Sequence, residues 1–170
     1  MSRASISQSE ENDISAVQDA MSDMSLHNLC FRAFCQATED ERKVRQALLF
    51  ASGGKEEKVE RTKCDGYHGN PIVILDVCIS SARPIRSFFQ RLSAEDREAL
   101  AHDLERRIDE ECAFYFRLDK QEAYLGRLVL GEKGDEDDII AVHGKVKSYP
   151  KSREASLRLM DEYLSSFDGE

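Results

Sequence analysis

The residue types that support catalysis occur in this sequence without the spacing that catalysis needs. Cys64 and His68 lie four residues apart, but no second ligand pair follows them at the spacing of a zinc site. No glycine-rich phosphate loop ends in Lys-Ser/Thr, and no Gly-x-Ser-x-Gly elbow is present. Acidic pairs such as Glu110-Glu111 are typical of solvated helix ends. We therefore expect no enzyme, cofactor or metal site; a metal-dependent hydrolase is the least favoured alternative.

A glycine-flanked loop, Gly66-Tyr67-His68-Gly69-Asn70-Pro71, is the first segment whose composition suggests binding. Glycines permit positive φ and let backbone N–H groups come close to the surface. With these donors, His68 and Asn70 are suited to bind a phosphate oxygen or a 2′-hydroxyl. The alternative is a purely structural turn between two strands.

A cationic segment around residues 115–127 is the second candidate. In an alternating strand Phe116 and Leu118 share one face, which places Arg117 on the other face near Tyr115. Lys120 follows in the connection, where a long side chain is expected to project into solvent, and Arg127 lies on the next expected strand. Together these cations suit an RNA backbone. The alternative is a hairpin with ordinary surface charges, in which Asp119 pairs locally.

Composition limits the classes of protein that fit. The chain has 170 residues and a formal net charge of −9, which argues against a protein that wraps nucleic acid through bulk positive charge. Residues 1–24 are polar, lack aromatic residues and carry a net charge of −4, so we expect a disordered acidic tail before a single domain at 25–170. No run of 18 apolar residues and no secretory signal is present, and five cysteines without a CxxC pair suggest reduced thiols in a cytoplasmic protein.

Hydrophobic periodicity predicts alternating strands and helices along the domain. A strand begins at Leu26, and a helix follows that is capped by Thr38 in a capping box with Glu41 and is ended by Gly53. Next are expected an exposed strand at 56–64, a central strand at 72–79, a helix starting near Pro84 and a helix capped by Ser93. A strand at 112–118 and a polar connection at 119–123 follow. The domain ends with strands at 124–130 and 139–146, joined by an acidic turn at 131–138, and a helix after Pro150. This order predicts an α+β two-layer sandwich, with one mixed, mostly antiparallel sheet and helices on one face.

Three stretches resemble the archaeal family of RNA-binding proteins or predicted exosome subunits. They are Phe31-Arg32-Ala33-Phe34 continuing to Val44, Gly66 to Ile72, and Phe116-Arg117-Leu118-Asp119-Lys120-Gln121 continuing to Gly126. The resemblance implies a fold like that of the ribosomal protein that holds five-S RNA, described as double-stranded-RNA-binding-like. It also implies a non-catalytic role, frequent homodimers and a link to the exosome.

Together the residues and the resemblance predict a non-catalytic RNA-binding accessory protein that contacts structured or double-stranded RNA through backbone and shape. The expected contacts are Arg32, Arg117, Lys120 and Arg127 to phosphate, with His68 and Asn70 to sugar or backbone. The alternative is a protein–protein adaptor in an RNA-processing assembly that does not itself touch RNA. The acidic tail and the negative domain favour that alternative because both repel phosphate.

Overall fold

Five strands form one fully antiparallel sheet in the order β2-β3-β1-β5-β4. The computed structural model describes residues 25–66, 69–131 and 138–168. The strands are β1 (Leu26–Cys35), β2 (Glu60–Asp65), β3 (Pro71–Ile79), β4 (Ala113–Asp119) and β5 (Ile139–Val146). The predicted α+β class is confirmed, and the long strand β1 lies at the centre of the sheet.

Alternation along each strand separates a buried face from an open face. In β1, Leu29, Phe31 and Ala33 are fully buried, whereas Arg32 between them is exposed. In β4, Phe114, Phe116 and Leu118 are buried while Tyr115 and Arg117 are exposed. Because side chains in a strand point alternately to opposite sides, these patterns fix which residues can reach a ligand on the open face.

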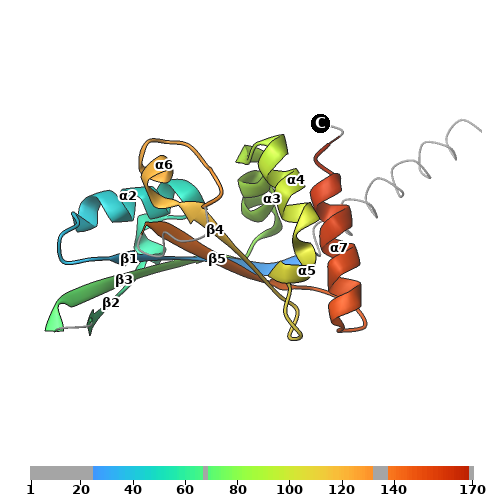
Figure 1. Cartoon of the computed structure of the whole chain (residues 1–170), viewed down its shortest axis with the longest axis horizontal. Coiled ribbons are helices and arrows are strands. Elements are labelled where there is room, and N and C mark those ends of the chain that lie inside the picture. Colours follow the sequence, from blue (N-terminus) through green and yellow to red (C-terminus); the bar gives the residue numbers. More distant parts are fainter. Residues whose placement is uncertain (1–24, 67–68, 132–137, 169–170) are drawn as a thin grey trace, which may run out of the picture.

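Helices cover the buried face in two groups (Figure 1). The first contains α2 (Glu41–Ser52) and the short α6 (Lys120–Tyr124), with the 3₁₀ turn η1 (Glu56–Lys58) after α2. The second contains α3 (Ala82–Arg91), α4 (Ala94–His102), α5 (Leu104–Arg107) and α7 (Arg153–Ser165). In Figure 1, α2, α3, α4 and α6 lie on one side of the sheet and α7 stands at its end, so no helix of the described residues covers the opposite face.

An aromatic cluster fills the space between the second group of helices and the sheet. Phe88 of α3 packs edge-on against Phe31 of β1 and Phe89, with ring centroids 5.2 Å apart in both pairs. Phe116 of β4 and Tyr163 of α7 complete the contact from two other elements. This packing confirms the predicted apolar face of the helix that starts near Pro84, and it holds β4 firmly against the helices.

Three predicted local features are wrong. The N-cap of α2 is Asp40, whose carboxylate accepts a hydrogen bond from the Arg42 N–H at 2.9 Å, and Thr38 is not the cap. The connection expected at 119–123 forms α6, capped by Asp119. Residues 124–130 form no strand; they contribute one isolated bridge, between Leu130 and Leu118. The Ser93 cap, by contrast, is confirmed, since its hydroxyl accepts from the Asp96 N–H at 3.1 Å.

The expectation that all five cysteines are reduced is also wrong. Cys30 of β1 and Cys78 of β3 are directly opposite each other in the antiparallel register and form a disulfide. Cys35 and Cys112 are buried free thiols, as expected of small apolar residues, and Cys64 is a partly exposed free thiol. The pairing depends on the register between strands 48 residues apart in sequence, which a count of cysteines does not contain.

Two predicted segments lie outside the described residues: the acidic tail at 1–24 and most of the acidic turn, at 132–137. Across the part of the chain that the structure does describe, no helix has the length and apolar character needed to cross a bilayer.

Candidate nucleic-acid interface

The open face of the sheet brings two of the predicted RNA contacts into one row. Arg32 of β1 pairs with Ala141 of β5, and Ala141 pairs with Arg117 of β4, so the two arginines are separated by a single strand. Adjacent strands are about 4.8 Å apart, which places the two backbone positions roughly 10 Å from each other. Both side chains are exposed. The face predicted for Arg117 from alternation is therefore confirmed, and Arg32 lies in the same row.

A broad hollow of about 960 Å³ extends from this row around the β4 edge to α5. Its charged and aromatic lining comes from three strands and the helical layer: Arg32, Asp103, Arg106, Arg107, Tyr115, Arg117 and His143. Four arginines against one aspartate make the hollow positive on a chain whose formal charge is −9. Such a concentration of guanidinium groups is suited to phosphate.

The arginines of the hollow differ in whether they form ion pairs with carboxylates of the protein. Arg107 is held by Asp103, with 3.7 Å between Nη2 and Oδ2, and burial lowers its pKa while that aspartate opposes the change. Arg106 is exposed at the end of α5. Among the described residues Arg117 forms no ion pair, whereas Arg32 is held by a carboxylate of β3. Arg117 and Arg106 are thus the cations most available to a ligand.

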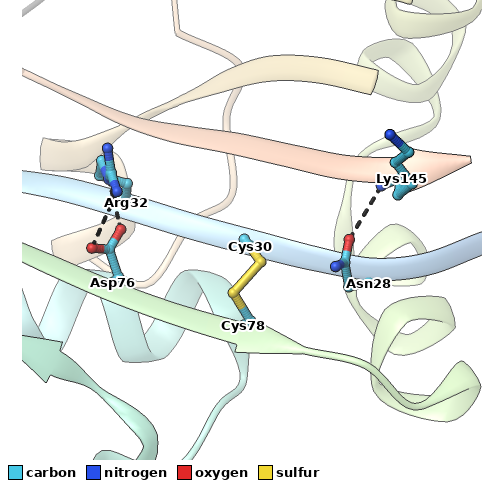
Figure 2. The surroundings of a disulfide bond; sticks show 6 residues. All are labelled: Asn28, Cys30, Arg32, Asp76, Cys78 and Lys145. Carbon is cyan, nitrogen blue, oxygen red and sulfur yellow. Dashed lines mark hydrogen bonds and ion pairs between the residues drawn. A yellow bond between two sulfur atoms is a disulfide. The ribbon is translucent and has the colours of Figure 1, made fainter. Parts of the chain in front are cut away.

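Figure 2 shows the carboxylate that holds Arg32. The Arg32 Nε donates to Asp76 Oδ1 at 2.7 Å and its Nη2 donates to Oδ2 at 3.4 Å, so the fork of the guanidinium meets both oxygens. This hydrogen bond raises the pKa of Arg32, and the side chain stays 49% exposed. The Cys30–Cys78 disulfide joins the same two strands one row away (Figure 2). Arg32 is therefore fixed in direction but accessible.

An aromatic pair lies in the neighbouring row of the open face. Tyr115 of β4 is 49% exposed, and its ring stacks on that of His143 of β5 with centroids 6.1 Å apart and planes inclined by 28°. Desolvation first, and then the charge of the nearby Asp109, raise the pKa of the Tyr115 hydroxyl. The Asp109 carboxylate accepts from the backbone N–H groups of Ala113 and Glu111, which lower its pKa.

The structure places Lys120 in the interior, so its expected projection into solvent is wrong. Its side chain is 3% exposed, and its Nζ lies 2.8 Å from Glu39 Oε1 and donates to the Phe34 carbonyl at 3.0 Å. Glu39 also accepts from the Gln36 N–H at 2.9 Å, so the lysine secures the turn between β1 and α2. The residue begins α6, which packs against α2 and carries the lysine inward.

The other predicted contacts are dispersed. Arg127 is exposed but lies 2.8 Å from Glu122, measured from Nε to Oε2. Asn70 is exposed at the β2–β3 hairpin, where its carbonyl accepts from the Gly66 N–H at 2.7 Å. His68 lies outside the described residues. Of the predicted contacts that fall within the described residues, the structure brings Arg32 and Arg117 together and leaves the other three apart from them.

The two glycines of this hairpin have different roles. Gly69 adopts a φ of 77°, which confirms the expected positive φ. A Cβ on Gly66 would lie 2.9 Å from the Asn70 carbonyl oxygen and 2.5 Å from the Ile72 side chain. Gly66 is therefore needed because the two strands approach closely at the turn.

Sequence reasoning missed Arg106, Arg107 and His143. The adjacent arginines end a short helix, and only tertiary packing brings that helix beside β4. For His143 a signal was present, because alternation along 139–146 places it on the open face. No group of three or more His, Cys, Asp or Glu side chains within the described ranges is arranged to hold a metal ion.

Comparisons with protein families and with curated proteins both find matches that are described as RNA-binding. Residues 28–147 match a family model described as RNA binding. The chain is 40% identical over 150 residues to an RNA-binding protein from Pyrococcus abyssi, an alignment that covers 84% of this chain and 96% of that protein.

Solved structures show a similar fold. A DUF54 protein from Methanothermobacter thermautotrophicus is 33% identical with a TM-score of 0.68, and the match covers 82% of this chain and 98% of that one. A DUF54-family protein from Archaeoglobus fulgidus is 31% identical with a TM-score of 0.70, covering 81% of this chain and 99% of the other.

Proposed function

We propose an RNA-binding role for this chain, which belongs to the RNA-binding family. The contact surface is the hollow at the β4 edge together with the adjoining open face of the sheet. Its ligand is the phosphate backbone of structured or double-stranded RNA, recognised by shape and without chemical conversion of the RNA. The observation that carries the proposal is the convergence of Arg32, Arg106, Arg107 and Arg117 on one hollow of an acidic protein.

The charge distribution explains how an acidic chain can bind a polyanion. A net charge of −9 opposes long-range attraction, so affinity has to come from local contacts in which a guanidinium meets a phosphate oxygen. The hollow provides such contacts from β1, β4 and α5. Phe88 of α3 joins β1 to β4 through ring contacts with Phe31 and Phe116, and α5 packs against β4. A rigid surface of this kind favours an RNA whose backbone already has the matching shape.

A salt titration with duplex RNA tests the proposal. If three or four phosphates are neutralised, the logarithm of the association constant should fall against the logarithm of the salt concentration with a slope on the order of −3 to −4. The measurement is fluorescence anisotropy of a labelled duplex from low salt upward. Absence of binding at about 50 mM salt, where phosphate contacts are strong, would overturn the proposal.

Partner proteins are a second part of the proposed function. The side chains of Leu125 and Val129, which are 65% and 36% exposed after α6, offer two apolar contacts on the segment that carries Arg127. An adaptor role in an RNA-processing assembly such as the exosome, or a homodimer, would use such a surface. Pull-down from nuclease-treated lysate separates the two functions, because partners held through RNA are lost and partners held by protein contact remain. Sedimentation of the purified chain tests the homodimer.

A further inference from the structure

We propose that Tyr115 and His143 form a stacking site for one unpaired base of the bound RNA. The inference deepens the proposed function and rests on it, because the arginines of the hollow have to hold the backbone beside the pair. It adds a second kind of contact: a base from a loop, bulge or end lying on an aromatic surface.

The position of the pair on the sheet supports this assignment. Tyr115 and Arg117 are two residues apart on β4 and therefore project from the same face, roughly 7 Å apart along the strand. His143 is directly opposite Tyr115 on β5, so the rings stack across the two strands. A nucleotide whose phosphate meets Arg117 would place its base over these rings.

The Tyr115 ring is exposed and also held in direction. Nearly half of the residue is accessible, although aromatic side chains of this size usually gain stability by burial. Its ring stacks on that of His143, the residue directly opposite on β5, with centroids 6.1 Å apart and planes inclined by 28°. The orientation is therefore fixed before any ligand arrives, which reduces the entropy lost on binding.

Charge decides which part of a nucleotide the pair accepts. Asp109 and Glu111 lie close enough to Tyr115 to raise its pKa, so a phosphate at this end of the surface would meet carboxylates. A neutral base would not be repelled, and every base has a face that stacks on an aromatic ring. Phosphate is thus directed to the arginine row and the base to the aromatic row.

The absence of tryptophan from the chain allows a direct test. Tyr115→Trp introduces a single tryptophan that keeps an aromatic face at this position. Its fluorescence should be quenched by an RNA hairpin with an unpaired loop and much less by a blunt duplex with the same stem. Tyr149→Trp is the matched control, because Tyr149 is 98% exposed and lies outside the hollow. Equal quenching at both positions, or by both RNAs, would overturn the assignment.

Affinity measurements provide the second arm. Tyr115→Ala should weaken binding of the hairpin about tenfold, within the range expected for loss of one stacked base, and weaken binding of the blunt duplex much less, because the duplex offers no unpaired base to the ring. Tyr115→Phe retains the ring and should restore most of the hairpin affinity. If the wild-type chain binds neither RNA, the proposed function fails. If it binds both and Tyr115→Ala alters neither, or both equally, only the stacking site fails.

Discussion

Arg117 and Lys120 are three residues apart, yet they belong to regions with opposite roles. Arg117 leaves β4 on the open face and is exposed beside the hollow, whereas Lys120 begins α6 and is buried against Glu39 on the helical side. Arg117 lies between the apolar residues Phe116 and Leu118, whereas Lys120 lies between the polar residues Asp119 and Gln121. The difference shows that a cation becomes available to a ligand through the face of the element that carries it, and that residue type alone does not decide this.

The largest effect is expected on the buried side. Lys120→Ala leaves the Glu39 carboxylate without its cation and the Phe34 carbonyl without its donor. Because Glu39 is itself 24% exposed, the free energy of unfolding should fall by about 3 kcal/mol, the low end of the range for a buried pair. Urea unfolding followed by circular dichroism measures this. Arg117→Ala is the matched control and should change stability by less than about 0.5 kcal/mol. A loss below about 0.5 kcal/mol for both variants would contradict the structural role of Lys120.

The disulfide tests the difference between the open face and the helical side, because it lies on the open face and yet should stabilise the fold. Cys30 and Cys78 are separated by 48 residues, and a cross-link over such a segment restricts the unfolded chain. Reduction should lower the free energy of unfolding by about 2–4 kcal/mol. The measurement is unfolding with and without reductant. A Cys30→Ala and Cys78→Ala double variant is the control, since its stability should not respond to reductant.

On the open face, the expected effect is on binding. Arg117→Ala should weaken duplex RNA binding about tenfold, equivalent to about 1.4 kcal/mol, and should reduce the salt slope by about 1. Arg158→Ala removes the same charge from an exposed position on α7 and should leave the affinity unchanged. Equal losses from both variants would show that the total charge matters and that the hollow does not.

The smallest effect concerns the cap of α2, on the helical side. Asp40→Ala removes the acceptor for the Arg42 N–H and should destabilise the protein by about 1 kcal/mol. Thr38→Ala, which changes the residue first expected to cap this helix, should have an effect below about 0.5 kcal/mol. Thermal unfolding of the two variants distinguishes the two caps. A larger loss of stability from Thr38→Ala than from Asp40→Ala would show that Thr38 caps the helix after all.

The fold was largely predictable, because its strands have one buried face. Hydrophobic patterns placed β1, β3, β4 and β5 close to their observed bounds, and alternation assigned Arg117 to the side opposite Phe116 and Leu118. The prediction failed at 119–130. The polar residues expected as a connection form α6, and the apolar run at 124–130, predicted as a strand, contributes one isolated bridge, because an apolar run alone does not distinguish a strand from a packed loop. Lys120 was misplaced because its role depends on α6 packing against α2.

The sequence by itself determined the α+β class, the helices ended by Gly53 and begun by Ser93, and the outward direction of Arg117. These follow from local periodicity and capping, which involve residues close together in the chain. Tertiary structure alone decided that Cys30 meets Cys78, that Arg106 joins Arg32 at one hollow, and that Lys120 is buried. Each of these depends on register or packing between distant segments, and local patterns carry no information about which distant segments become neighbours.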